Sequence, residues 1–175
     1  MGVIFASLAA SLDGYIRSAS GDMAWLNDSM RRDEDYGMAE TMTRAGAYIM
    51  GATTFRESAS MFGGSAAGLS TYVVTHAAPA DAPPGVTFHA GDVGELSESA
   101  KAGTDKDVNV FGGGDIVTQT VAAGALDELT IALIPVVLGS GTRLFGDVGH
   151  ETYLRLTDCQ SFASGIVMLK YERVS

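Results

Sequence analysis

The sequence predicts an α/β fold with a mixed, mostly parallel central sheet, helices on both of its faces and a C-terminal antiparallel hairpin. Strand-like apolar runs alternate with helix-like segments through residue 123, which is typical of parallel strands joined by helical connections. The last third differs, because Leu154 to Phe162, the turn at 163–165 and Ile166 to Tyr171 follow one another as two strands of a hairpin. The sheet is therefore expected to be mixed, with the hairpin on one side.

Each element follows from a local pattern. Strands are expected where β-branched, aromatic and small apolar residues cluster, at 3–10, 47–51, 71–75, 86–89, 107–111, 127–138, 153–162 and 165–173. Helices are expected at 33–44, 53–60, 93–102 and 116–123; the first carries Tyr36, Met38, Ala39 and Met42 at roughly helical spacing. The prolines between residues 79 and 85 mark a surface connection, too short to link two domains.

Composition restricts the function classes. A chain of 175 residues with 46% hydrophobic and 18% charged residues is expected to fold as one domain over residues 1–175. The net charge of −10 argues against a nucleic-acid partner, which needs clustered Lys and Arg. No run is apolar enough to span a bilayer, so we expect no membrane partner and a cytoplasmic location. Cys159 stands alone and the three histidines form no His-x-x-x-His pair, so no metal site is expected.

The most informative segment is Val108 to Val117, in which Gly112, Gly113 and Gly114 separate a buried strand from a short helix closed by Gly124. Glycines let a ligand approach the backbone, and a helix N-terminus directs its N–H groups at an anion. This pattern suits a phosphate or pyrophosphate. It is equally the pattern of a tight turn that packs a helix onto a sheet.

Two further segments are rich in glycine. Tyr48 to Phe55 repeats the strand, glycine and helix start, with Gly51 leaving room for a ligand and Thr53 or Thr54 available as a cap. Leu138 to Gly146 begins like a dinucleotide-binding fingerprint, but Leu144 stands where the last glycine belongs. It is either a lining loop or a structural turn.

The loop after the first strand is the fourth candidate region. It runs from Ser11 through Asp13 to Trp25 and Asn27, and loops at the carboxyl ends of strands are where open α/β sheets bind ligands. Asp13 would orient a substrate, relay a proton if burial raised its pKa, or simply brace a turn with the glycine that follows. Trp25 would offer a flat wall for stacking or anchor the core.

In this order the segments resemble the dihydrofolate reductase-like superfamily, and within it the reductase domain of the riboflavin-pathway deaminase–reductase. The matching segments are residues 9–16, 21–26, 50–55, 110–114, 124–129, 135–141 and the terminal hairpin to Tyr171. The resemblance covers nearly the whole chain. It implies a three-layer dihydrofolate reductase-like fold and a reductase that uses NADPH, with NADH not excluded.

The resemblance also implies where the ligands bind. The pyrophosphate would contact the turn and helix start formed by Gly112, Gly113, Gly114, Asp115 and Ile116. The cofactor would also be held from the neighbouring helix start by Gly51, Thr53 and Thr54. The adenosine would lie near Thr75 and His76, and the nicotinamide would lie between Ala9 and Ile16. The substrate would contact Ser11, Asp13, Trp25, Asn27, Leu138 and Gly139, with Asp13 and Trp25 as the catalytic residues.

Three positions depart from the family pattern. Ala52 replaces an Arg that commonly meets cofactor phosphate, so the preference for NADPH over NADH is open, with Arg56 or His76 as substitutes. Met30 occupies the position of the dihydrofolate reductase carboxylate, which argues against dihydrofolate as substrate. Asp115 places a negative charge beside the expected phosphate, unless it serves as an N-cap and points away.

The expected function is that of a stand-alone reductase, without the deaminase, that reduces a small heterocyclic substrate and resembles 5-amino-6-(5-phosphoribosylamino)uracil reductase of riboflavin biosynthesis. A homodimer is expected. The alternative is a non-catalytic nucleotide-binding or dimeric interaction protein on the same fold. The hypothesis of a dimeric interaction protein depends on the apolar run Ile131 to Leu138, but a central strand buried on both faces explains that run as well.

Overall fold

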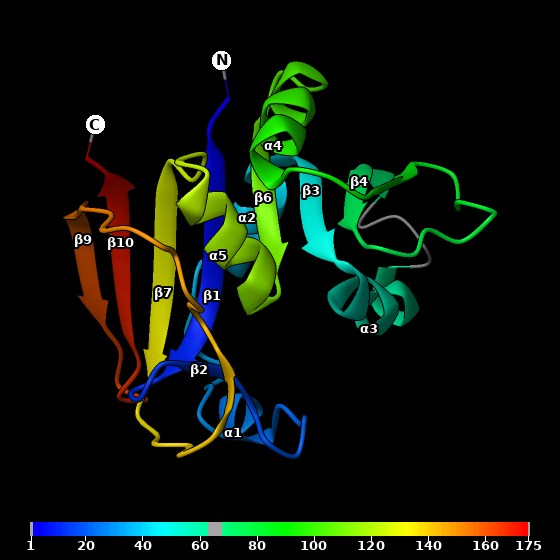
Figure 1. The fold of residues 1–175 in the computed structure, drawn as a ribbon. Helices are drawn as coiled ribbons and strands as arrows, with labels where there is room; N and C mark the ends of the chain where they lie inside the picture. The colour runs from blue at the N-terminus through cyan, green and yellow to red at the C-terminus, as the bar shows by residue number, and fades with distance from the viewer. Residues whose placement is uncertain (1, 63–67, 175) are drawn as a thin grey trace.

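The structure is a computed structural model that describes residues 2–62 and 68–174. Within these residues, eight strands form one sheet in the order β5-β4-β3-β6-β1-β7-β10-β9, and β2 pairs with β8 in a small second sheet (Figure 1). The strands of the large sheet are β1 Ile4–Ser11, β3 Ala45–Gly51, β4 Ser70–Val74, β5 Val86–His89, β6 Asp107–Gly112, β7 Glu128–Ile134, β9 Leu154–Ser161 and β10 Val167–Arg173.

The pairing confirms the mixed sheet. The strands from β5 to β7 in this order all run parallel. Helices lie in the connections that lead to β3, β4, β6 and β7, whereas residues 75–85, which lead from β4 to β5, form a loop. β10 pairs antiparallel with both β7 and β9, and thus adds the hairpin to one edge. β9 is exposed along its whole length.

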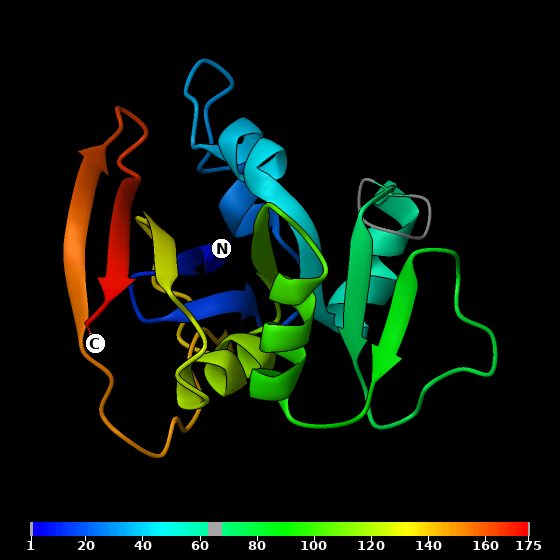
Figure 2. The ribbon, with the colours of Figure 1, turned by 90° about the horizontal axis from the view of Figure 1, so that it is seen from above.

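Helices cover both faces of the sheet (Figures 1 and 2). One face packs against α4 Val93–Ala102 and α5 Gly114–Ala122, where Ile4, Val108 and Val117 are fully buried. α2 Met38–Arg44 and α3 Ala52–Phe62 lie on the other face, whose core contains Phe5, Tyr48 and Met50. β9 and β10 extend beyond the helices (Figure 2). Across the described residues, every helix is too short or too polar to cross a bilayer.

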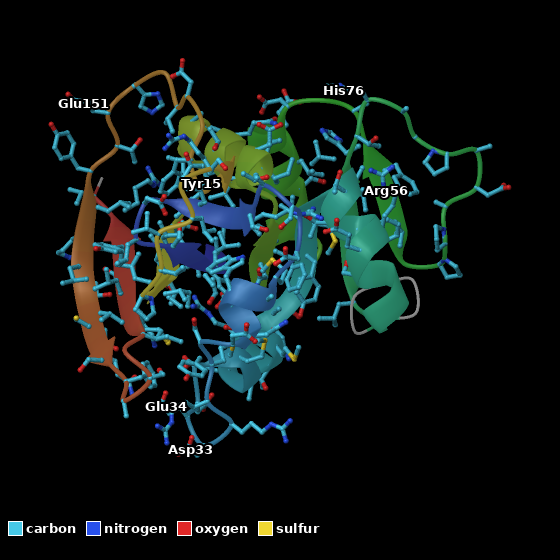
Figure 3. All side chains as sticks on the ribbon, turned by 90° about the horizontal axis from the view of Figure 1, so that it is seen from below. Tyr15, Asp33, Glu34, Arg56, His76 and Glu151 are labelled. Atoms are coloured by element: carbon cyan, nitrogen blue, oxygen red, sulfur yellow. The ribbon has the colours of Figure 1, made fainter. Side chains whose placement is uncertain are left out.

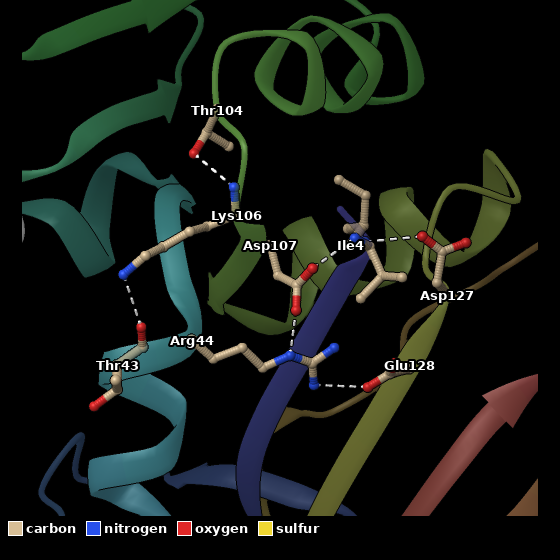
Figure 4. A network of polar contacts seen from close by, with 9 residues as sticks. Ile4, Thr43, Arg44, Thr104, Lys106, Asp107, Asp127 and Glu128 are labelled. Atoms are coloured by element: carbon tan, nitrogen blue, oxygen red, sulfur yellow. Dashed lines mark hydrogen bonds and ion pairs between the residues drawn. The ribbon is translucent and has the colours of Figure 1, made fainter. Parts of the chain in front are cut away.

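Charged side chains fasten the amino ends of the central strands (Figure 4). Arg44, at the end of α2, contacts Asp107 and donates to Glu128 at 2.7 Å. Burial by itself would lower the pKa of Arg44, but the hydrogen bonds to Glu128 and Asp107 outweigh it and raise that pKa. Asp107 also accepts the Val3 amide at 2.8 Å, so one cluster joins β1, β6, β7 and α2.

Two predicted boundaries are wrong for physical reasons. The helix expected from residue 33 begins only at Met38, because Glu34 and Tyr36 bind the hairpin turn at Ser164 and Gly37 adopts φ +74°. The strand expected over 127–138 ends at Ile134, because Pro135 has no N–H to donate.

The sequence patterns also missed two strands and one short helix. β2 Tyr15–Ser18 and β8 Gly141–Arg143 pair across a long separation, and neither is apolar enough to stand out in the sequence. α1 Ala24–Asn27 is a single turn.

Candidate functional site

The carboxyl ends of four adjacent strands form the candidate site. β3, β6, β1 and β7 are neighbours and run parallel, so the chain after Gly51, Gly112, Ser11 and Ile134 emerges at the same edge of the sheet. Ligands in open α/β sheets bind at this edge. The fold thus brings together the four segments that the sequence singled out separately.

The glycine turn leads directly into α5. Gly112 has φ +121°, which favours glycine, and its peptide bond to Gly113 is cis. Gly113 is the N-cap of α5 and supplies no side-chain cap. Asp115 lies in the first turn with an exposed side chain and does not cap the helix, so the N-cap role suggested for it is wrong. The first amides of a helix have no intrahelical acceptor and are therefore available to an anion.

The three glycines of the turn have different surroundings. A Cβ on Gly114 would overlap the carbonyl oxygen of Arg143, so this glycine is required by close packing against β8. A Cβ on Gly113 would meet only the Thr54 hydroxyl, at an ordinary contact distance of 3.6 Å. Gly113 therefore leaves its Cα side open for a ligand, whereas Gly114 does not.

The starts of α3 and α5 lie side by side. A Cβ on Gly51 would come within 3.3 Å of the Ile116 side chain, so Gly51 allows α5 to pack against the end of β3. Thr54 faces Gly113, and Thr53 is exposed and accepts from the Arg56 guanidinium at 3.2 Å. The two strand–glycine–helix units of the sequence therefore form one surface.

Thr75 and His76 follow β4, farther toward the edge of the sheet. The Thr75 hydroxyl donates to the Ala77 carbonyl at 3.3 Å, and His76 is exposed. In Figure 3, Arg56 and His76 lie on the side of the molecule that carries α3 and β4, whereas Asp33 and Glu34 lie at the bottom of the view. Arg56 and His76, the two side chains that were expected as substitutes for an Arg at position 52, therefore lie on the same side as the start of α3.

Asp13 braces two loops. Its carboxylate accepts from the Ser11 hydroxyl at 2.6 Å and from the backbone amides of Leu138 at 3.1 Å and Gly139 at 2.7 Å. The Ser11 hydrogen bond is the main cause that lowers the pKa of Asp13 from its ordinary 3.8 to about 2; burial opposes this, and the amides of Gly139 and Leu138 add to the lowering. The raised pKa that a proton relay requires is therefore not found.

Further backbone hydrogen bonds lock the same loops together. The Leu12 amide donates to the Val136 carbonyl, and the Leu144 amide donates to the Gly14 carbonyl, both at 2.9 Å. The third glycine-rich segment becomes β8, where a Cβ on Gly141 would overlap the backbone of β2. This segment is a structural turn and strand rather than a dinucleotide fingerprint.

The remaining predicted residues divide between core and surface. Ala9 is half-buried on β1 in register with Ala132, and Ile16 packs against the core from β2. The Nε1 of Trp25 is buried and makes no hydrogen bond within residues 2–62 and 68–174. The side chain of Asn27 is exposed.

Two arginines that the sequence reasoning did not single out help to shape the site. Arg17 pairs with Glu57 at 2.7 Å, which ties β2 to α3, and its Nε donates to Gly21. Arg143 lies over the Tyr15 ring at 4.9 Å. The sequence offered no signal for either contact, because each joins residues far apart in the chain. Among the described residues, His, Cys, Asp and Glu form no group that would hold a metal ion.

Comparisons with known proteins agree with this geometry. The model of the RibD C-terminal domain family matches residues 3–168. The uncharacterized protein YwjB of Bacillus subtilis is 32% identical over 174 residues, which are 95% of each chain. A Shewanella sp. PV-4 protein assigned to riboflavin biosynthesis has a similar structure, with a TM-score of 0.87 at 21% identity over 99% of both chains.

A dihydrofolate reductase confirms the fold class. The enzyme from Enterococcus faecalis, solved in complex with NADP(H), superposes with a TM-score of 0.64 at 18% identity, covering 99% of this chain and 98% of that one. At this level of identity the likeness shows the fold alone. The expected dihydrofolate reductase-like architecture is therefore confirmed.

Proposed function

The chain belongs to the RibD C-terminal domain family, and from that membership we propose that it is an NADPH-dependent reductase of a small heterocyclic substrate. The observation that carries the proposal is the joint surface of two helix starts at the carboxyl edge of the sheet, where Gly113 faces Thr54 and Gly51 contacts Ile116. Two helix N-termini at one surface favour a ligand with two phosphates.

The residues present fit a nicotinamide dinucleotide. The open side of Gly113 and the first amides of α5 would contact the pyrophosphate, and Thr53, Thr54 and Arg56 would hold it from α3. Ala9 would lie against the nicotinamide, because a residue without a bulky side chain lets a flat ring lie on the strand. The cofactor supplies the hydride when it is bound.

The protein's own contribution is position and exclusion of water. Asp13 fixes the loop at Leu138 and Gly139 over the end of β1, and the pair of Arg17 with Glu57 fixes β2 against α3. Reaction rates depend strongly on such alignment of donor and acceptor. In this proposal Asp13 is a positioning residue, and Trp25, whose buried Nε1 has no partner among the described residues, offers its indole face to the substrate.

The test is transfer of deuterium. The purified protein would be titrated with NADPH while Trp25 fluorescence is followed, and then incubated with NADPH deuterated at the nicotinamide C4 and with a panel of aminopyrimidines and pterins. We expect a saturable fluorescence change and deuterium in one reduced product. Saturable binding of NADPH without transfer to any member of the panel would favour the non-catalytic nucleotide-binding protein instead, and absence of binding would overturn both.

We also propose a homodimer. Its support is the exposed hairpin edge, where Leu154, Leu156 and Tyr153 are 37%, 49% and 69% exposed. The run Ile131 to Leu138 gives less support, since its first part is the central strand β7. Light scattering of the wild type and of a Leu156→Lys variant tests this; a monomeric wild type would contradict it.

A further inference from the structure

A cavity of about 170 Å³ lies between α2 and the sheet, outside the set of residues that the resemblance assigned. Its floor is a polar row in which Ser7 of β1 pairs with Thr130 of β7, and Thr130 pairs with Lys170 of β10. Tyr36, Glu40 and Thr41 line it from the side of α2. Thr157 of β9 also lines it, so the cavity is built from four strands and one helix rather than from a single loop.

This cavity adjoins the proposed nicotinamide position. Ala9, Ala132 and Met168 form the next row across the same three strands, two residues along from Ser7, Thr130 and Lys170. Residues two apart on a strand share a face, so both rows face α2. Met168 lines the cavity. A substrate placed beside the nicotinamide at Ala9 would therefore reach the cavity directly.

The charges in the cavity disfavour an anion. Three carboxylates line it, Glu40, Glu128 and Glu172, against two cations, Arg44 and Lys170. Arg44 is held by Glu128 and Asp107, and the Lys170 ammonium lies 3.9 Å from Glu40. Glu172 in turn pairs with Arg155 at 2.7 Å, so that with Asp107 included four carboxylates stand against three cations. A phosphate or carboxylate entering here would meet an excess of negative charge and no cation without a carboxylate beside it.

The uncharged groups in the cavity suit a polar ring. The hydroxyls of Ser7 and Thr130, which line the cavity, make no hydrogen bond to any described residue, and each can both donate and accept. The volume is that of one six-membered ring, since a cavity of about 150 Å³ holds benzene. Hydroxyls on the floor and carboxylates at the rim match a ring that carries N–H donors and carbonyl acceptors.

We infer that this cavity selects the substrate by charge: it holds an uncharged, hydrogen-bonding ring and rejects an anionic substituent on that ring. Glu40 and Thr130 are the residues that decide this specificity. The inference rests on the proposed reductase function for its connection to turnover, but binding in the cavity is measurable without turnover.

The experiment compares two probes of the same ring size that differ in charge. Calorimetry at neutral pH would measure binding of 5-aminouracil, which is neutral, and orotate, which carries a carboxylate, to the protein with and without saturating NADPH. We expect 5-aminouracil to bind at least about tenfold more tightly. Glu40→Gln should narrow this difference by improving orotate binding, and Thr130→Val should weaken 5-aminouracil about three- to tenfold through loss of one hydrogen bond. Glu98→Gln, on the exposed face of α4, is the matched control and should change neither.

The outcomes separate this inference from the proposed function. Three results would each overturn the cavity inference, even if deuterium transfer from NADPH is observed. The first is that orotate binds as tightly as 5-aminouracil, and the second is that 5-aminouracil does not bind. The third is that the Thr130→Val and Glu40→Gln variants fold normally and bind both probes like the wild type. The expected probe selectivity in a protein that does not bind NADPH would support the cavity and overturn the reductase.

Discussion

The Asp13 carboxylate accepts a hydrogen bond from the Gly139 amide at 2.7 Å, although 126 residues separate the two along the chain. The contact joins the loop that leaves β1 to the loop that leaves β7, at the edge of the sheet where the candidate site lies. A residue that the sequence offered as a substrate-orienting group, a proton relay or a turn residue thus also ties two loops together.

The first prediction concerns this tie. Asp13→Asn should accelerate amide hydrogen exchange at Leu138 and Gly139, because an amide side chain accepts these hydrogen bonds more weakly than a carboxylate. NADPH affinity should stay nearly unchanged while turnover falls severalfold. The pH profile of the remaining turnover should keep the wild-type midpoints, because Asp13 moves no proton in this scheme. A lost or shifted limb of that profile would instead identify Asp13 as an acid or base.

The second prediction is a pH dependence. The pKa of Asp13 in the folded protein is about 2, below the ordinary 3.8, so its contribution to stability is fully present above about pH 3.8 and is lost as the pH falls through about 2. The hydrogen bonds to Leu138 and Gly139 should therefore persist at pH 3. Titration of the Asp13 carboxyl signal by NMR checks this, and a midpoint near 3.8 would show that the tie is absent in solution.

The third prediction separates two neighbouring glycines. The Gly113→Ala variant should fold normally, because Gly113 has φ −74° and its added Cβ would meet only Thr54 at an ordinary distance. Its binding free energy for NADPH should be weaker by about 1–3 kcal/mol, because the methyl group obstructs the approach of a charged phosphate to the turn. Gly114→Ala should instead lower the free energy of unfolding by about 1–3 kcal/mol, because its Cβ would overlap the Arg143 carbonyl. Calorimetry measures the NADPH affinity and denaturant unfolding measures the stability. Equal NADPH affinity in Gly113→Ala and wild type would show that the pyrophosphate does not bind at this turn.

The fourth prediction concerns the choice of cofactor. Because Ala52 stands where the family resemblance implies an Arg, the preference for NADPH over NADH should be under about 2 kcal/mol. Arg56 is exposed beside Thr53 at the start of α3, so Arg56→Ala should remove most of that preference. Arg155→Ala, which breaks only the pair with Glu172 on the exposed hairpin, should leave it unchanged. If Arg56→Ala keeps the full preference, His76 becomes the residue to test.

The sequence by itself determined which segments form the strands of the large sheet and that this sheet is mixed, whereas the order of the strands came from the structure. Alternating apolar runs and helix signals are local properties, so the eight strands of the large sheet and the glycine turn before α5 were predictable. The resemblance to dihydrofolate reductase-like proteins rested on the order of such local motifs, and it predicted the correct fold.

The tertiary structure alone decided the roles of individual residues. The β2–β8 pairing, the tie between Asp13 and Gly139, and the row of Ser7, Thr130 and Lys170 join segments whose separation leaves no periodic trace in the sequence. The same holds for the glycines, since Gly113 and Gly114 are identical in the sequence and differ only in what lies beside them. Local patterns fix where strands and helices form, whereas pKa shifts, open backbone and specificity arise from neighbours that only the folded chain supplies.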